Sequence, residues 1–437
     1  MARRVLREGR STVYWGATHG LPQLVVRRAA RRGDLQGRLT LAGAGGGGVD
    51  AVIEEIRAAG PLAQGAFGGV TVDHAVVREV LTSNDFRSGS PVGTTFLARV
   101  AQATRPDVLS PLEPPSLLVT EPPEHTRYRK LVTRVFTARA VERLRERTEK
   151  IAVELLDDLE ARRPDGRPAD LVAAYCGLLP VTVISAILGV AEGDRRRVLE
   201  LGEGAAPSLD FGLGWGTYRK VARDIREFDS WLTGHISYLR RNPGEDLLSQ
   251  LIQARDDQGA LTELELKSTA GLVLAAGFET TVNLLGNGIK LLHDHPGQLA
   301  RLRADPGLWP NAVDEVLRVD SPVLLTGRVA ARATEVAGTT LPAGSFVTTI
   351  LAGANRDPNV FDDPGRFDVT RPNARDHVSF SLGRHHCLGA SLARMEGAVG
   401  LRALFDRYPG LTLLPGARRR PTRILRGWET LPARLEA

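Results

Sequence analysis

The stretch Phe-Ser-Leu-Gly-Arg-His-His-Cys-Leu-Gly at residues 380–389 decides the fold of this chain. It has the spacing Phe-x-x-Gly-x-x-x-Cys-x-Gly, and a helical pattern at residues 390–396 follows it directly. The chain has 12 Phe, 46 Gly and 2 Cys among 437 residues. At these frequencies the number of matches expected by chance in the whole chain is about 6 in 10,000. The pattern is therefore specific, and Cys387 is its reactive group.

The chemistry of Cys387 follows from its place between a loop and a helix. Backbone N–H groups and the positive end of the helix dipole stabilise a cysteine thiolate at such a junction. Gly383 permits a tight turn that presents the sulfur, Gly389 lets the helix approach a flat macrocycle without an intervening Cβ, and Phe380 shields the sulfur from water. A thiolate ligand on haem iron favours cleavage of the O–O bond. The alternative is a buried structural cysteine.

Residues 380–389 resemble the haem-ligand loop of cytochrome P450 enzymes, with Ser381 at a position where glycine is common. The resemblance continues in family order from about residue 50 to residue 437, and it is closest to the soluble actinobacterial members. It implies the cytochrome P450 fold, which is mainly α with a small β-rich subdomain. It also implies haem b as the cofactor, with Cys387 as the axial ligand to the iron.

A second motif, Ala-Ala-Gly-Phe-Glu-Thr-Thr at residues 275–281, lies inside an apolar helical run. A buried acid there is costly unless it is used or compensated. A hydroxyl at Thr280 backed by the carboxylate of Glu279 can relay protons through water to iron-bound dioxygen, although a threonine within a helix often bonds back to the preceding turn. The segment resembles the oxygen-binding helix of the family, which implies that Ala276 and Gly277 line the haem. Gly277 leaves room for oxygen or allows the helix to bulge.

Two further groups of charged residues match the family. Glu315 and Arg318 stand at i and i+3 on one helical face. The resemblance makes them the structural pair of the family and makes Arg366 the arginine that completes the triad, with Gly365 where an acid is frequent. We assign this triad to stability and haem incorporation.

The two haem propionates require fixed cationic or N–H donors, preferably arginine, at the rim of the pocket. The resemblance carries this role over to four residues from separate segments of the chain. For each of them alone, the alternative is an exposed charge on a helix or loop. The four are His125, Arg129, Arg328 and His385.

Composition narrows the remaining possibilities. The two cysteines, Cys176 and Cys387, are far apart, which excludes a disulfide framework and a structural zinc cluster. No apolar run approaches the roughly 20 residues of a membrane span, and no secretory signal is visible, so we expect a cytoplasmic protein. The 57 basic and 51 acidic residues are interspersed, so we expect no nucleic-acid partner.

Residues 1–48 are rich in arginine and end in a glycine run. We expect a basic leader with one short helix, joined by a flexible glycine-rich tether to a single haem-thiolate monooxygenase domain at residues 49–437. The stretch 24–38 is compatible with a membrane or a partner surface, but the pattern favours a solvated basic helix. A small mixed sheet is predicted in the early part of the domain, and mostly helices follow residue 124.

These observations predict a monooxygenase that inserts one atom of dioxygen into a hydrophobic small molecule, by hydroxylation or epoxidation in secondary metabolism. With no flavin or iron–sulfur domain in the chain, electrons would come from NAD(P)H through a separate ferredoxin and ferredoxin reductase. An acidic ferredoxin would dock on Arg129, Lys130, Arg134 and Arg384. The alternatives are a peroxide-driven peroxygenase, a catalytically silent haem-fold partner protein and a haem-based gas sensor. Substrate selection is expected in residues 86–118, 206–217 and 323–326.

Overall fold

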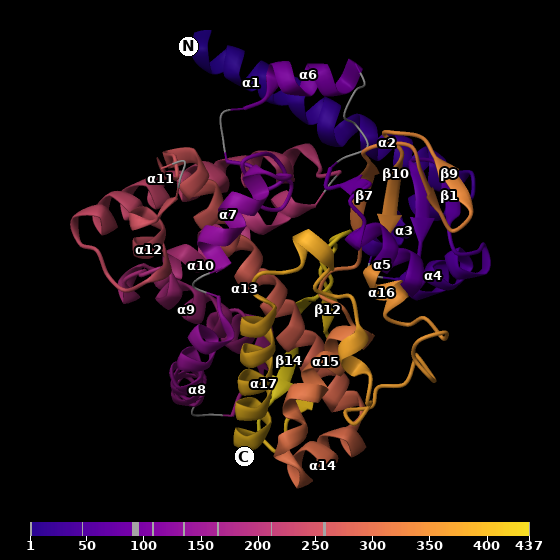
Figure 1. Cartoon of the computed structure of the whole chain (residues 1–437). Helices are drawn as coiled ribbons and strands as arrows, with labels where there is room; N and C mark the ends of the chain where they lie inside the picture. Colours follow the sequence, from indigo (N-terminus) through magenta and orange to yellow (C-terminus); the bar gives the residue numbers. More distant parts are fainter. Residues whose placement is uncertain are drawn as a thin grey trace.

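The computed structural model describes residues 2–45, 47–89, 96–106, 109–133, 136–163, 166–210, 212–256 and 259–436. Helices dominate this part of the chain (Figure 1), which confirms the mainly α prediction. The α-helices are α1 (Ala2–Trp15), α2 (Leu21–Arg31), α3 (Leu35–Gly45), α4 (Val49–Ala58), α5 (His74–Thr82), α6 (Phe96–Thr104), α7 (Glu124–Thr133), α8 (Ala138–Ala161), α9 (Leu178–Ile187), α10 (Arg195–Ala205), α11 (Trp215–Arg241), α12 (Leu247–Gln253), α13 (Glu263–Asp294), α14 (Pro296–Ala304), α15 (Trp309–Val319), α16 (Leu351–Ala354) and α17 (Ala390–Arg407).

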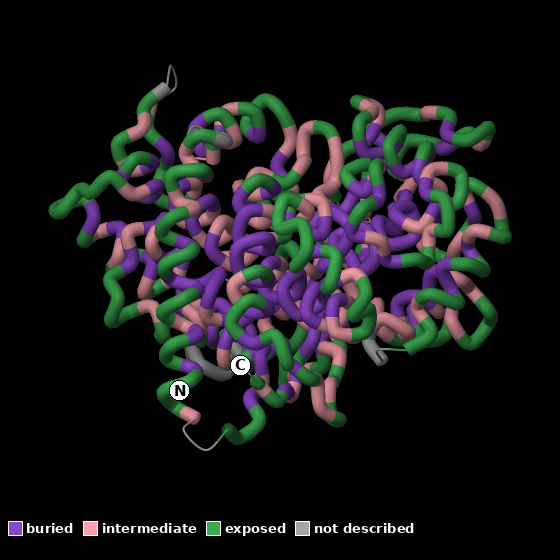
Figure 2. The backbone as a smooth tube through the Cα atoms, turned by 90° about the horizontal axis from the view of Figure 1, so that it is seen from below, coloured by how far each residue is buried: buried purple, intermediate pink, exposed green. Residues whose placement is uncertain are grey.

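The long helix α13 runs through the middle of the molecule and packs against α9 and α17 (Figure 1). It begins with a capping box, in which the side chains of Thr262 and Glu265 each bond to the backbone N–H of the other. Gly397 allows α17 to approach closely, because a Cβ at this position would lie 3.0 Å from Leu284 of α13. The buried residues concentrate in the centre of the molecule (Figure 2), so α13 places the motif at 275–281 deep in the protein.

A five-stranded sheet forms the centre of the β-rich subdomain, with the strand order β1-β2-β10-β7-β3. Strand β10 pairs in parallel with β2, and the other pairs are antiparallel. Val70 and Val347 are fully buried, and the residues that follow them, Thr71 and Thr348, are buried as well, so both faces of the central strands are covered. The strands are β1 (Ala63–Gly65), β2 (Gly68–Thr71), β3 (Phe86–Arg87), β7 (Thr326–Ala330) and β10 (Phe346–Thr349).

Smaller sheets lie elsewhere in the chain. Near the C-terminus, β11 and β4 flank β14, and β12 pairs with β13. Two short hairpins are formed by β5 with β6 and by β8 with β9. The bounds are β4 (Ala169–Asp170), β5 (Arg255–Asp256), β6 (Gly259–Ala260), β8 (Thr334–Val336), β9 (Thr339–Leu341), β11 (Thr412–Leu413), β12 (Arg418–Arg419), β13 (Trp428–Thr430) and β14 (Pro432–Arg434).

The N-terminal segment differs from the expected leader. The prediction of one short helix is wrong, because α1, a π-helical turn η1 (Gly16–Gly20), α2 and α3 occupy residues 2–45. The expected tether is also shorter than predicted, since α3 continues to Gly45 and α4 begins at Val49. Leu39 of α3 is 1% exposed and packs with Ile53 and Val70 in the core of the β-rich subdomain.

None of the helices in the described part of the chain is long and apolar enough to cross a membrane.

Candidate active site

The loop before α17 presents Cys387 through two residues with left-handed backbone conformations. The φ angle is +57° at Ser381 and +67° at Gly383. A Cβ at Gly383 would lie 2.5 Å from the carbonyl oxygen of Leu81, so only glycine fits this turn. The backbone N–H of Cys387 closes the loop by donating to the Phe380 carbonyl oxygen at 2.8 Å. The left-handed φ of Ser381 also gives a physical reason why glycine is common at this position.

The environment of Cys387 matches a thiol that faces a cavity. The side chain is exposed, yet the surrounding protein is dense enough that burial raises the pKa of the thiol. The backbone N–H of Gly389 and the guanidinium groups of Arg129 and Arg394 act in the opposite direction and lower this pKa. The thiol is therefore accessible although protein surrounds it, and these three neighbours favour its thiolate form.

Phe380, whose carbonyl oxygen accepts the bond from the Cys387 N–H, has its ring in a cluster of rings and one cation. The guanidinium carbon of Arg394 is 4.7 Å from the centroid of the Phe380 ring, and the rings of His377 and His386 are 5.7 and 6.4 Å from it. The Nε atom of Arg394 is 2.6 Å from Oδ1 of Asp314. The cluster fixes the orientation of Phe380, as its predicted shielding role requires.

Two of the predicted propionate partners are buried polar groups without an acidic partner among the described residues. Arg328 is 5% exposed and bonds only to neutral oxygens, including the Gly327 carbonyl at 2.9 Å and Ser381 Oγ at 3.5 Å. Burial lowers the pKa of Arg328 to about 10. His125 is 2% exposed, and its Nε2 atom has no hydrogen-bond partner in the described chain. Burial lowers the pKa of His125 to about 4.

The other two predicted partners lie next to these groups. The imidazole ring of His385 is 4.5 Å from that of His125, and its Nε2 atom lies 3.1 Å from Oε1 of Glu121. Arg129 donates to the His386 carbonyl oxygen at 2.7 Å, one residue before the cysteine. The structure therefore brings α7, β7 and the cysteine loop together at one site.

The buried acid of α13 has a partner that sequence reasoning missed. Glu279 is 2% exposed, and its Oε1 atom is 2.8 Å from the Arg420 guanidinium. Its Oε2 atom has no hydrogen-bond partner among the described residues. Burial raises the pKa of Glu279, the Arg420 cation lowers it, and Glu203 raises it further. The carboxylate is thus held by a charge from the C-terminal hairpin while one of its oxygens remains available.

Thr280 makes the backbone bond that was considered as the alternative to a proton relay. Its Oγ1 atom donates to the Ala276 carbonyl oxygen at 2.8 Å, and Thr281 bonds in the same way to Gly277 at 3.0 Å. Of the two roles predicted for Gly277, the bulge is absent, because α13 is a continuous α-helix from Glu263 to Asp294; the role of leaving room for oxygen stays a prediction. Ala276, Gly277 and Thr280 are half-buried although they lie in the middle of a central helix.

The structural triad contains Arg371 rather than Arg366. Glu315 and Arg318 are both fully buried and form two bonds of 2.7 and 2.8 Å. The Nε atom of Arg371 lies 3.1 Å from Glu315 Oε1. The Arg366 side chain is 56% exposed and faces Asp368 at 3.5 Å. Only the backbone carbonyl of Arg366 takes part, by accepting bonds from the other two arginines, so its assignment as the third cation is wrong.

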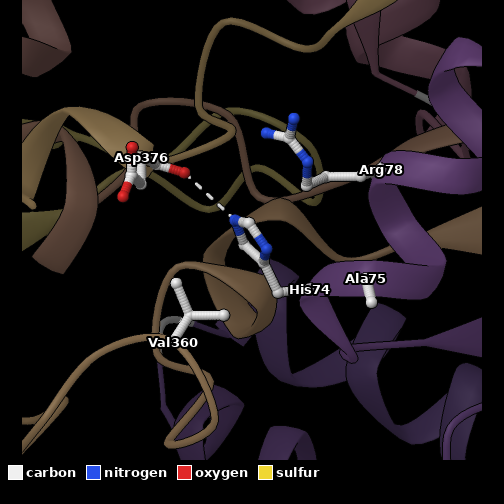
Figure 3. A pocket seen from close by; sticks show the side chains of 5 residues that line it. All are labelled: His74, Ala75, Arg78, Val360 and Asp376. Atoms are coloured by element: carbon white, nitrogen blue, oxygen red, sulfur yellow. Dashed lines mark hydrogen bonds between the residues drawn. The ribbon is translucent and has the colours of Figure 1, made fainter.

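A separate cavity of about 490 Å³ lies at α5 (Figure 3). It is lined by His74, Ala75, Arg78, Val360 and Asp376, and His74 Nε2 is 3.0 Å from the Asp376 carbonyl oxygen. None of the predicted haem residues lines this cavity, so we assign it no part in the site around Cys387.

Comparison with known proteins identifies the family. The protein described as cytochrome P450 140 of Mycobacterium tuberculosis is 52% identical over 431 residues, which cover 97% of each chain. The chain belongs to the cytochrome P450 family. A sequence model of this family, Cytochrome P450, matches residues 308–422. The 6-deoxyerythronolide B hydroxylase of Saccharopolyspora erythraea is 43% identical over 321 residues, covering 72% of this P450 and 77% of the relative.

Solved structures share the fold of this P450. The crystal structure of P450BioI in complex with an acyl carrier protein carrying hexadec-9Z-enoic acid superposes with a TM-score of 0.79 at 31% identity. The superposition covers 88% of this chain and 98% of that chain. The predicted family, fold and enzyme class are therefore confirmed, and the protein is a cytochrome P450 monooxygenase.

Proposed function

We propose that this P450 holds haem b through the Cys387 thiolate and inserts one atom of dioxygen into a hydrophobic small molecule. The observation that carries the proposal is the thiol of Cys387, which is accessible inside the protein beside Arg129, Arg394 and the Gly389 N–H. When bound, the haem supplies dioxygen activation, which a thiolate ligand promotes. The residues of this chain bind and orient the haem, exclude water and supply protons.

The groups around Cys387 fit a flat, doubly anionic cofactor. Arg328 is a buried cation surrounded by neutral acceptors, and His125 Nε2 is a buried polar atom without a partner in the described chain. Both would be satisfied by propionate oxygens, with Arg129 and His385 next to them. A Cβ at Gly389 would meet no protein atom within 4 Å, which leaves space for the macrocycle beside the start of α17.

Protons would reach the reacting oxygen from Glu279 and Thr280. Glu279 keeps one oxygen without a partner among the described residues, and its raised pKa makes proton exchange near neutral pH easier. Thr280 would have to rotate its hydroxyl away from the Ala276 carbonyl to bond to water or oxygen. Ala276 and Gly277 would line the haem on the same side.

A ferredoxin and its reductase would deliver the electrons to the side of the protein near the cysteine loop. Of the basic residues predicted to dock the ferredoxin, Lys130 is exposed, whereas Arg384 pairs with Glu121 at 2.9 Å and Arg129 bonds to the loop backbone. Arg134 lies outside the described residues. Lys130 is therefore the main candidate contact with the ferredoxin. The proposed location of the protein is the cytoplasm.

A hydrophobic secondary metabolite is the proposed substrate, and hydroxylation or epoxidation is the proposed reaction. The hydroxylase relative, whose name specifies 6-deoxyerythronolide B, supports this class of chemistry. Comparing turnover driven by peroxide with turnover driven by NADPH, ferredoxin and reductase distinguishes the monooxygenase from the peroxygenase alternative.

The first experiment is the absorption spectrum of the reduced protein with carbon monoxide, for wild type and for Cys387→Ala. We expect the red-shifted band of thiolate-ligated haem in wild type and its loss in the variant. An unchanged band in Cys387→Ala, or a wild-type protein that takes up no haem, would refute the proposal and favour a silent haem-fold partner protein. Cys176→Ala is the matched control, because Cys176 is buried in the main core.

A further inference from the structure

The positive charge of this protein is concentrated at its N-terminus. Residues 1–33 contain eight arginines and one acid, Glu8. The other residues therefore hold 49 basic side chains (57 less 8) and 50 acidic ones (51 less 1), so the net charge of +6 comes from the first 33 residues. Such separation of charge produces a local positive potential that attracts anionic partners.

Helix α2 combines these arginines with exposed apolar side chains. Val26 and Ala29 face inward and are buried, whereas Leu21, Leu24 and Val25 are 47%, 59% and 51% exposed. The arginines that follow them are exposed, and none forms an ion pair with another described residue. They are Arg27, Arg28, Arg31 and Arg32.

The spacing along α2 places both kinds of side chain on one face. Leu24 and Val25 lie three and four residues after Leu21, Arg28 lies four and three residues after them, and Arg32 lies four residues after Arg28, so all five share one face of the α-helix. An apolar stripe that continues into arginines is typical of helices that lie at the interface between lipid headgroups and acyl chains.

Helices at the same end of the molecule as α2 also carry exposed apolar side chains. Val13 of α1 is 46% exposed and Phe96 of α6 is 77% exposed. With the three residues of α2 they make up five of the ten large hydrophobic residues that are exposed in the described chain. Figure 1 shows α1, α6 and α2 along one end of the molecule. Exposed apolar side chains concentrated at one end of a protein indicate an interaction surface there.

Aromatic contacts fix this end of the molecule against α11. The Trp15 indole Nε1 atom donates to the Leu213 carbonyl oxygen at 2.8 Å. The ring centroids of Trp15 and Trp215 are 5.5 Å apart, and those of Tyr14 and Tyr218 are 6.3 Å apart. The N-terminal helices therefore have a defined orientation on the protein, next to the segment 206–217 that we assign to substrate selection.

We propose that the exposed face of α2, together with Val13 and Phe96, binds the surface of an anionic lipid bilayer. The aliphatic and aromatic side chains insert at the boundary between headgroups and acyl chains, and the arginines bind lipid phosphates. A second copy of the chain would bring the same positive charge to the same surface, which opposes self-association. An acidic protein would match the arginines, but it would leave the exposed Leu24 and Val25 unexplained.

The test is co-sedimentation of the full-length haem protein with vesicles of phosphatidylcholine alone or with about one third phosphatidylglycerol. We expect binding only to the anionic vesicles. Arg28→Gln with Arg32→Gln is expected to weaken binding about 25-fold, because each arginine near an anionic surface contributes roughly a fivefold factor. Leu24→Gln with Val25→Gln is expected to abolish binding.

The matched control is Arg162→Gln with Leu264→Gln, two exposed side chains far from α2 in sequence, which is expected to bind like wild type. Far-ultraviolet circular dichroism of each variant verifies that the fold is intact, so failure of this test can be distinguished from failure of the proposed function. Absence of wild-type binding to anionic vesicles, or unchanged binding of the α2 variants, would overturn the proposal. The proposal would also be overturned if the wild-type protein formed a dimer and Leu24→Gln with Val25→Gln dissociated it. The same holds if Arg28 and Arg32 were required for binding an acidic protein but not for binding vesicles.

Discussion

Replacing Arg371 with methionine is expected to destabilise the protein strongly, whereas the same replacement at Arg366 is expected to have little effect. Glu315 is fully buried and interacts with two cations, Arg318 and Arg371. Removing one partner of a buried ion pair costs about 3–5 kcal/mol. The Arg371 side chain also donates to the Asp362 carbonyl oxygen at 2.7 Å, which loses its bond in the variant.

Among the described residues, the exposed side chain of Arg366 pairs only with Asp368 at 3.5 Å, and such surface pairs contribute about 0–1 kcal/mol. Urea unfolding followed by far-ultraviolet circular dichroism measures the free energy of unfolding of each variant. Because a typical domain is stable by about 5–15 kcal/mol, the loss at Arg371 should lower the midpoint clearly. Equal losses for Arg371→Met and Arg366→Met would refute the reassignment of the triad.

A double-mutant cycle sharpens this test. In a Glu315→Gln background the buried carboxylate is gone, so Arg371→Met should cost less than it does in wild type. Additive effects of Glu315→Gln and Arg371→Met would show that the two side chains do not interact.

Three further outcomes are expected. Ser381→Gly should raise the free energy of unfolding by about 0.5–1 kcal/mol in urea titrations, because glycine adopts a φ of +57° without strain; a loss of stability would contradict this. Gly383→Ala should greatly reduce haem content, measured by absorbance per protein, since its Cβ would clash with the Leu81 carbonyl oxygen; full haem content would disprove the turn argument. Burial raises the pKa of Glu396 well above its usual value. A group whose folded pKa is raised loses its stabilising contribution as pH rises above the unfolded value, by at most about 1.4 kcal/mol per pH unit. Glu396→Gln should therefore melt at a higher temperature than wild type, with a difference that grows as the pH rises above the unfolded pKa of the carboxyl group; a difference independent of pH would exclude this explanation.

Local motifs made the site around Cys387 predictable. The left-handed turn at Gly383 and the position of the cysteine before a helix depend on residues within ten positions of each other. The buried acid at Glu279 was also visible, because a charge inside an apolar helical run requires compensation. Its partner was not visible, since Arg420 is one of several arginines in a row and reaches α13 only through the fold.

Non-local packing explains the two main errors. Arg366 and Arg371 lie on the same loop, and only the path of the backbone decides which guanidinium enters the core. The N-terminal segment was predicted as a leader because its charge is high, but Leu39 completes a hydrophobic cluster with residues of α4 and β2 that no local pattern connects to it. Arg394 was missed for a similar reason, because its contact with Phe380 depends on how α17 leaves the cysteine loop.

The contacts of Trp15 also determine how the N-terminal helix α1 unfolds locally. Terminal segments usually fray, since few interactions hold them. Here Trp15 bonds to a carbonyl 198 residues further along the chain, and its ring packs on Trp215. The amide protons of α1 and of the start of α11 should therefore exchange with solvent as one cooperative unit. If a protease cut the chain just after Trp15 and α1 dissociated, the segment around Leu213 and Trp215 in the middle of the chain would lose these contacts at the same time.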